Sequence, residues 1–323
     1  MAIPLLINPK AGSLFRSGLK AWLKKHGKEF EIIPTKSAAD LTANARRLAE
    51  AGVPVVAAAG GDGTLMSAAQ GLAGTRTALG ILPCGTMNVF SRELGIGSRR
   101  FDSALDAMKG AKREKVDLFA INGKPFLQVA GFGPDARVIE LITPRLKKRM
   151  GAAAHVVTGL KVAIEKPTLI TMTLPDGEIL QGTQIIMGNG KRYGGAAHLF
   201  ADAAYDDGRL DAAIIDQAHL GIFFEVMGLI VSQGATKHNI SDFTSLRRIK
   251  SCEISAEGPL PYHLDGDYAG TLPPGETLHI ERLPHQLMVC VPELVEEQTP
   301  LEKVMSHPMM VALREKLQLL NEL

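Results

Sequence analysis

A run of apolar residues at 53–59 leads directly into a cluster of glycines, and this junction constrains the fold more than any other feature of the chain. Apolar residues at helical spacing follow the cluster. Glycine lets the backbone approach an anion closely, and the first N–H groups of a helix point toward such an anion. The junction therefore predicts a buried strand, a tight loop and a helix that together form an anion site. The loop residues are Gly60, Gly61, Asp62, Gly63 and Thr64.

Strands and helices are predicted to alternate along the first third of the sequence. Apolar runs at 3–8, 30–34, 53–59 and 79–82 are separated by helical patterns. Such alternation is typical of a parallel, doubly wound sheet with helices on both faces. Two common phosphate loops are excluded, because the sequence contains no GxxxxGK[ST] and its glycine cluster lacks the third glycine of GxGxxG.

Two further polar loops follow predicted strands of the same region. Asn8 begins the loop after the first strand, and Thr86 and Asn88 lie in the loop after the fourth. Loops that follow neighbouring parallel strands meet at the carboxyl edge of the sheet, where ligands bind. We therefore expect these residues to face the same ligand as the glycine cluster. Asp62 has two interpretations: it handles a Mg²⁺ ion or a proton beside the ligand, or it caps a helix.

The pattern changes near residue 113, where short strands begin to dominate. Asn122 and Gly123 separate apolar runs at 116–121 and 126–130, which predicts a hairpin. We expect an α/β domain at 1–120 and a β-rich, antiparallel domain at 121–291, with residues 292–323 packing back on the first domain as an amphipathic helix. After a mostly helical stretch at about 135–164, strands are predicted at 169–174, 179–187, 209–216, 250–256, 277–283 and 287–291.

Composition limits the partners. The chain has 36 Lys and Arg against 34 Asp and Glu, and a formal charge of +2 argues against nucleic-acid binding, which needs a basic footprint. Its 3 cysteines show no zinc or disulfide spacing. The sequence shows no signal peptide and no apolar stretch near the length of about 18 residues that spans a membrane. We expect a cytoplasmic protein. A basic cluster at 145–149 suits anionic lipid head groups and equally suits a solvated helix face.

Seven motifs, in order along about residues 3–291, resemble the diacylglycerol kinase catalytic-domain family. The family includes bacterial diacylglycerol and other lipid kinases and the sphingosine and ceramide kinases. The resemblance implies a nucleotide-binding α/β domain, a β-rich lipid-binding domain, and an active site in the cleft between them. The motifs are Asn8-Pro9-x-Ala11-Gly12, Gly60-Gly61-Asp62-Gly63-Thr64, Pro83-x-Gly85-Thr86-x-Asn88, residues 131–135, residues 188–195, residues 206–211 and Leu264-Asp265-Gly266-Asp267.

By this resemblance, ATP lies on the loop from Gly60 to Thr64. Thr86 lies at the phosphates, and Thr35, after the second predicted strand, lies near the nucleotide. Asp62 lies where phosphate, Mg²⁺ and the acceptor hydroxyl meet.

The same resemblance assigns roles in the second domain. Asp267 stands where the family has the glutamate that is its proposed proton acceptor, and we expect Asp267, alone or with Asp62, to take that role. Asp207 matches a Mg²⁺-binding loop, with its side chain and the carbonyl groups of Ala204 and Arg209 as ligands. From the residues alone, an ordinary Asp-Gly turn suits this segment equally well.

Together these features predict a lipid kinase that depends on ATP and Mg²⁺ and meets its lipid at the membrane surface as a peripheral protein. Two alternatives stay open: a kinase of soluble substrates of the NAD-kinase type, and a non-catalytic protein that binds lipid or nucleotide. The identity of the lipid and the oligomeric state also stay open, with a homodimer among the options.

Overall fold

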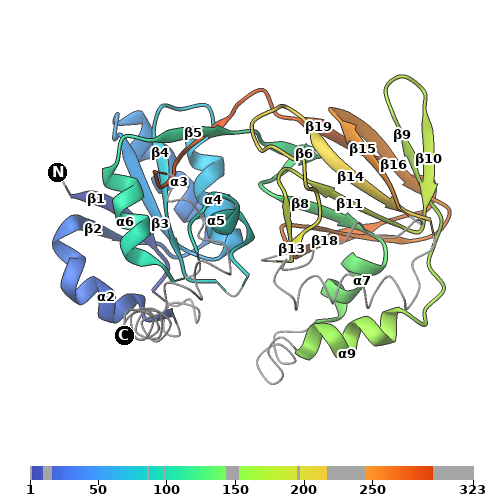
Figure 1. The fold of residues 1–323 in the computed structure, drawn as a ribbon, viewed down its shortest axis with the longest axis horizontal. Coiled ribbons are helices and arrows are strands. Elements are labelled where there is room, and N and C mark those ends of the chain that lie inside the picture. Colours follow the sequence, from blue (N-terminus) through green and yellow to red (C-terminus); the bar gives the residue numbers. More distant parts are fainter. Residues whose placement is uncertain are drawn as a thin grey trace, which may run out of the picture.

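The computed structural model describes residues 2–9, 17–85, 87–97, 99–142, 153–194, 197–216 and 244–293. An α/β part and a β-rich part lie side by side (Figure 1). Thr86, the basic cluster at 145–149 and the helix predicted near the C-terminus lie outside the described residues.

The α/β part is built on a six-stranded sheet of order β2-β1-β3-β4-β20-β5. Strands β1 to β4 are parallel, as their alternation with helices predicts, and β5 is antiparallel to β20. β3 and β4 are buried along their whole length because helices cover both faces of the sheet. The strands are β1 (Ile3–Ile7), β2 (Phe30–Pro34), β3 (Val55–Gly60), β4 (Ala78–Pro83), β5 (Arg113–Val116) and β20 (Leu287–Cys290).

α2 and α6 cover one face of this sheet. Trp22 of α2 joins them, because its Nε1 donates a hydrogen bond to Oδ1 of Asp102 in α6 at 2.7 Å. The connections through α3 and α4 cross the sheet in the direction opposite to that through α2, so right-handed crossovers place α3 and α4 on the other face. The helices are α2 (Leu19–His26), the short η1 (Gly27–Glu29), α3 (Ala38–Glu50), α4 (Asp62–Leu72), α5 (Val89–Glu93) and α6 (Phe101–Lys109).

β20 lies inside the range expected for the second domain, yet it pairs with β4 and β5 of the first sheet. Its residues Leu287, Val289 and Cys290 are buried in the core of the α/β part. An apolar strand has the same sequence signature in either domain, so only its packing partners reveal where it belongs. Within the described residues, the chain therefore crosses between the two parts twice, after β5 and before β20.

The β-rich part contains two six-stranded sheets that pack face to face around one core. Their orders are β10-β9-β16-β19-β6-β7 and β15-β14-β11-β8-β17-β18. The strands are β6 (Phe119–Ile121), β7 (Lys124–Phe126), β8 (Val129–Phe132), β9 (Ile170–Thr173), β10 (Ile179–Gly182), β11 (Gln184–Gly188), β14 (Leu210–Ile215), β15 (Thr244–Ile249), β16 (Ser251–Ala256), β17 (Leu260–Leu264), β18 (Asp267–Leu272) and β19 (Leu278–Arg282). Helices α7 (Pro134–Leu141) and α9 (Ala153–Val162) follow β8, and β12 (Arg192–Tyr193) pairs with β13 (Ala197–His198).

The hairpin predicted around Asn122 and Gly123 is confirmed, with φ of 48° and 78° at these residues between β6 and β7. The single strand predicted at 179–187 is wrong, because it divides into β10 and β11, which belong to different sheets. The division occurs at Gly182, where a Cβ would lie 2.6 Å from the backbone oxygen of Ile215. A glycine at such a close approach lets the chain pass from one sheet to the other.

Candidate active site

The loops after β3 and β4 meet with their backbones in contact. A Cβ added to Gly61 would lie 3.2 Å from Gly85 Cα, and one added to Gly85 would lie 2.7 Å from Gly61 Cα. Gly60 is also restricted, because a Cβ there would lie 2.3 Å from the side chain of Thr64. Packing of the two loops therefore requires these glycines, and the loops meet as expected for neighbouring parallel strands.

Asp62 connects these two loops. Its carboxylate accepts hydrogen bonds from the N–H groups of Val89, at 3.3 Å, and Phe90, at 3.2 Å, in the first turn of α5. Burial, with a smaller contribution from the Asp265 carboxylate, raises the pKa of Asp62 to about 6. The contacts match the capping interpretation of Asp62, except that the helix it caps is α5 and not its own.

Three other predicted residues lie at the same edge of the sheet. Thr35 directly follows β2, and its hydroxyl is buried without a hydrogen-bond partner among the described residues. Asn8 follows β1 and is partly buried. Asn88 is fully buried, and its amide nitrogen donates to the backbone oxygen of Gly85 at 2.9 Å. A buried hydroxyl without a partner is costly, so Thr35 suits contact with a ligand, whereas Asn88 braces the second loop.

Asp267, the first residue of β18, reaches this loop from the β-rich part. It is exposed, as is Gly63 on the other side. A Cβ added to Gly63 would lie 3.1 Å from Asp267 Oδ2. Residues 204 positions apart in the sequence are therefore neighbours in space. The structure brings a carboxylate of the β-rich part against the glycine loop of the α/β part.

The turn before Asp267 is tightly anchored. Asp265 and Gly266 have φ of 50° and 81°, as a two-residue turn between antiparallel strands requires. The Asp265 carboxylate accepts hydrogen bonds at 2.8, 2.8 and 3.0 Å from the N–H groups of three successive residues that precede and begin β8. Asp265 therefore holds the turn in place, which leaves Asp267 as the acidic side chain of this motif that faces the glycine loop. The three donors are Leu127, Gln128 and Val129.

The Asp207 loop contains arginine beside its carboxylate. Asp207 Oδ1 accepts the N–H of Arg209 at 2.9 Å, and Oδ2 lies 3.8 Å from Arg248 Nη1. Arg248 also contacts Asp211 Oδ1 at 3.4 Å. Ala204 lies in the same loop and is partly buried. The part of the chain that the structure describes holds no group of three or more His, Cys, Asp or Glu side chains arranged for a metal ion. The contacts of Asp207 match the Asp-Gly turn that the sequence left open, and the ligand set of one side chain and two carbonyl groups stays a prediction.

A fully buried aspartate, Asp117, ties this loop to the crossing between the two parts. Its Oδ2 accepts the N–H of Gly208 at 2.6 Å, and its Oδ1 accepts hydrogen bonds from Arg282 and Gln286. Sequence reasoning missed Asp117, because its partners lie 91 to 169 positions away. Its only local signal is a carboxylate flanked by apolar residues.

Glu93 at the end of α5 binds the β-rich part directly. Its carboxylate accepts the N–H groups of Lys191 and Arg192, both at 3.0 Å. Gly190 packs against it, since a Cβ there would lie 2.8 Å from the carboxyl carbon of Glu93. The sequence offers no local signal for this contact, which joins the helix capped by Asp62 to the second part.

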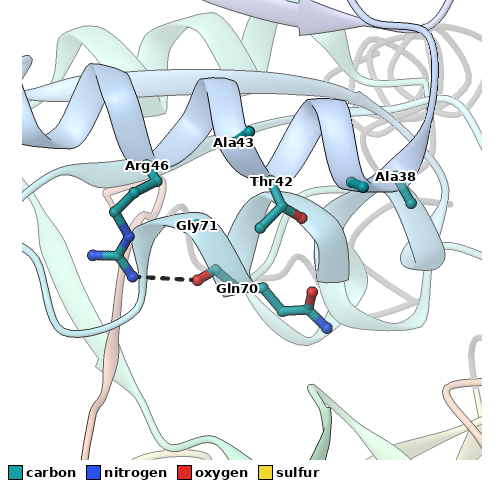
Figure 2. Close-up of a pocket in the computed structure, with 7 residues that line it drawn as sticks. Ala38, Thr42, Ala43, Arg46, Gln70 and Gly71 are labelled. Carbon is teal, nitrogen blue, oxygen red and sulfur yellow. Dashed lines mark hydrogen bonds between the residues drawn. The ribbon is translucent and has the colours of Figure 1, made fainter.

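A hollow between α3 and α4 contains none of the predicted site residues (Figure 2). Small side chains line it, and Arg46 at one end donates hydrogen bonds to the backbone oxygens of Gln70 and Ala73. Arg46 thus binds carbonyl groups at the end of α4, and the hollow adds nothing to the site at the glycine loop. The residues that line the hollow are Ala38, Ala39, Thr42, Ala43, Arg46, Gln70 and Gly71.

Among the described residues, no helix is long and apolar enough to cross a membrane.

Comparison with known proteins gives matches over both parts of the chain. Residues 2–121 match the diacylglycerol kinase catalytic domain, and residues 128–291 match the YegS C-terminal NAD kinase beta sandwich-like domain. A diacylglycerol kinase from Bacillus subtilis (strain 168) is 29% identical over 293 residues, which cover 88% of this chain and 95% of that protein. A diacylglycerol kinase from Staphylococcus aureus (strain JH9) is 30% identical over 286 residues, which cover 86% and 89%.

A solved structure shares the same arrangement of elements. The crystal structure of a protein described as a candidate diacylglycerol kinase from Bacillus anthracis str. Sterne is 26% identical and has a TM-score of 0.69. The match covers 90% of this chain and 95% of that one. The similarity therefore extends over both the α/β part and the β-rich part.

Proposed function

Because the chain belongs to the diacylglycerol kinase catalytic-domain family, we propose that it transfers the γ-phosphoryl group of ATP to the hydroxyl group of a lipid such as diacylglycerol. The observation that carries the proposal is the contact between Asp267 and Gly63 across the two parts. Phosphoryl transfer needs alignment of donor and acceptor, neutralisation of phosphate charge and a group that takes the hydroxyl proton.

The glycine loop supplies alignment at the nucleotide. α4 begins at Asp62, and the N–H of Gly63 in its first turn would attract a phosphate, whereas the N–H of Thr64 already donates to the Gly61 carbonyl at 2.9 Å. The buried hydroxyl of Thr35, without a partner among the described residues, supports a nucleotide contact there, and Asn8 lies at the same edge. ATP supplies the phosphoryl group, and Mg²⁺ bound with it would neutralise charge on its phosphates.

Asp267 is the group that takes the proton. As the lipid oxygen forms its bond to the γ-phosphorus, the bond from that phosphorus to the β–γ bridging oxygen breaks, and the hydroxyl proton passes to the Asp267 carboxylate. The products are ADP and a lipid phosphate. Exposure of Asp267 toward the glycine loop supports this role, since a proton acceptor must lie within reach of its donor.

Asp62 aligns the two loops in this proposal and does not share the proton. Its carboxylate already accepts two backbone N–H groups of α5, which supports the role of a fixed connection between the loops. The proposal gives the Asp207 loop no part in the reaction, because Arg248 lies beside both Asp207 and Asp211.

The lipid would reach the site at a membrane surface. One face of α9 and the turn after it exposes Val157, Leu160 and Ile164, with exposed fractions of 39%, 41% and 79%. Val157 and Leu160, three residues apart, lie on the same side of α9, and Ile164 follows in the turn after the helix. The exposed residues Lys161 and Lys166 lie beside them in the sequence. This surface supports brief peripheral contact with anionic lipid.

Incubation of the protein with γ-labelled ATP, Mg²⁺ and a total lipid extract tests the proposal. We expect label in a lipid phosphate, and identification of that lipid names the substrate. Label in a water-soluble product alone would favour the NAD-kinase type of reaction. Absence of any labelled product, with ATP and lipid both bound, would favour a non-catalytic binding protein.

A further inference from the structure

A buried histidine–aspartate pair lies behind the turn that carries Asp267. His263 Nε2 lies 2.7 Å from Asp135 Oδ2, and the two side chains are only 3% and 11% exposed. His263 belongs to β17, and Asp135 lies in the first turn of α7, 128 positions away. Gly131 makes room for the pair, because a Cβ there would lie 2.3 Å from both of these atoms. The proposed reaction does not use this pair directly, so its burial calls for another explanation.

The second ring nitrogen of His263 binds the turn itself. The N–H of Gly266 donates to His263 Nδ1 at 3.3 Å. Nδ1 is therefore an acceptor, so Nε2 carries a proton and donates it in the hydrogen bond to Asp135. Gly266 directly precedes Asp267 in the chain. One imidazole ring thus connects α7 to the residue next to Asp267.

β18 needs such an anchor. It is the edge strand of its sheet and pairs only with β17 among the described strands. The register between β17 and β18 shifts at Tyr262 and His263, and a shift of this kind changes the direction of a side chain. The shift occurs at the residue whose ring binds Asp135. The contacts of the His263 ring therefore help to hold β18 in place, together with its backbone hydrogen bonds to β17.

The Asp135 side chain forms a second hydrogen bond, with a residue close to the contact between the two parts. The hydroxyl of Tyr193 forms a hydrogen bond with the Asp135 side chain. Tyr193 directly follows Lys191 and Arg192, whose N–H groups bind Glu93 of α5. The contacts thus continue from α5 to Asp135, and through His263 to the turn that faces Gly63.

We infer that His263 is a positioning residue, which acts with Asp135 to hold the turn so that the Asp267 carboxylate stays against the glycine loop. The inference rests on the proposed function, in which Asp267 takes the proton. An aspartate reaches about 1.5 Å less far than the glutamate of the family, so its backbone must be held closer to the reacting groups. A displacement of about 1 Å in such a site costs about 100-fold in rate.

A double-mutant cycle between His263 and Asp267 tests the inference. His263→Leu removes both ring contacts, and we expect kcat to fall at least about tenfold while the KM for ATP stays within about twofold. His263→Asn keeps an acceptor for the Gly266 N–H, so we expect it to recover part of kcat. In the Asp267→Ala background, His263→Leu should cause no further loss, because its effect passes through Asp267.

His279→Leu is the matched control. His279 is also a histidine of the β-rich part, but its side chain is 62% exposed and pairs with the exposed Glu253. We expect normal kcat in this variant. Should His263→Leu fail to fold, Tyr193→Phe removes one hydroxyl from Asp135, and we expect a loss of kcat of a few fold that also disappears in the Asp267→Ala background.

Additive losses in the cycle would overturn the inference, as would normal kcat in His263→Leu. The proposed function fails in a different way. If Asp267→Ala alone keeps normal turnover, Asp267 is not the proton acceptor, whatever the His263 variants do.

Discussion

The α/β part and the β-rich part build their halves of the candidate site in different ways. In the α/β part, the residues from Gly60 to Thr64 are contiguous, and they join a strand to the helix that follows it. In the β-rich part, Asp267 depends on distant contacts, since the partners of Asp265 lie 136 to 138 positions away and the partner of His263 lies 128 away. The first half is a local structure, and the second is a product of sheet packing.

This difference between the two parts predicts the largest effect at Asp267. Removal of its side chain should abolish phosphoryl transfer and leave the nucleotide site of the α/β part intact. We expect Asp267→Ala to lower kcat by about 100-fold or more, the scale on which a general base contributes. The affinity for ATP should stay unchanged, because the α/β part supplies the glycine loop. Steady-state kinetics and calorimetric titration with ATP measure the two quantities separately. Normal kcat in this variant would place the base elsewhere.

Asp267→Glu tests the same role of the Asp267 carboxylate as proton acceptor. It restores the residue that the family has at this position and lengthens the side chain by one methylene. We expect partial or improved turnover if the turn tolerates the longer side chain. If the wild-type chain proves inactive and this variant is active, the chain is a binding protein and not a kinase.

The opposite result is expected at Gly61 of the α/β part, where a substitution should weaken nucleotide binding and leave the β-rich part intact. A Cβ at this position would lie 3.2 Å from Gly85 Cα, so Gly61→Val forces the two loops apart. We expect the affinity for ATP to fall about tenfold or more, and overpacking to cost about 1–3 kcal/mol of unfolding free energy. Gly27→Ala is the control, since no atom lies within 4 Å of a Cβ at Gly27. Unchanged affinity in a folded Gly61→Val protein would place the nucleotide elsewhere.

Asp62 connects the two loops, and its raised pKa predicts a pH effect on stability. A folded-state pKa of about 6, above the ordinary aspartate value of 3.8, means that the folded chain binds this proton more tightly than the unfolded chain does. The resulting stabilisation is complete below pH 3.8 and is lost as the pH rises through 6. Between pH 7.5 and pH 5, we expect the wild type to gain about 1 kcal/mol relative to Asp62→Asn.

Urea unfolding of both proteins at the two pH values measures this difference. Carboxylates that do not interact with Asp62 titrate equally in the two proteins, so their contributions cancel, and only Asp265, whose charge acts on Asp62, adds to the difference. A constant difference would show that Asp62 is ionised in the folded protein down to pH 5.

The smallest effect is expected at the Asp207 loop, where Arg248 pairs with both Asp207 and Asp211. Asp207 and Arg248 are both partly exposed, with side-chain fractions of 28% and 36%, so the pair contributes little. We expect Asp207→Asn to change the unfolding free energy by less than about 1 kcal/mol. EDTA should leave the melting temperature of the nucleotide-free protein unchanged. A rise in melting temperature on addition of Mg²⁺, lost in Asp207→Asn, would restore this loop as a metal site.

Local patterns in the sequence predicted much of the fold and one half of the site. The alternation of strands and helices predicted the parallel sheet, and the Asn122-Gly123 pair predicted the hairpin of β6 and β7 in the β-rich part, because both patterns act over a few residues. The glycine loop was visible for the same reason. Resemblance to a family, and not spacing, pointed to Asp267.

Packing partners far along the chain decided the rest. The sequence alone determines that a strand forms near residue 287, but the core of the α/β part decides that β20 pairs with β4. The sequence places a carboxylate in a glycine loop, but the fold decides that Asp62 binds the N–H groups of α5. The contacts of His263 and Asp135 exist only once two sheets and α7 have packed together. Hydrogen bonds and burial depend on distance in space, which a local pattern does not encode.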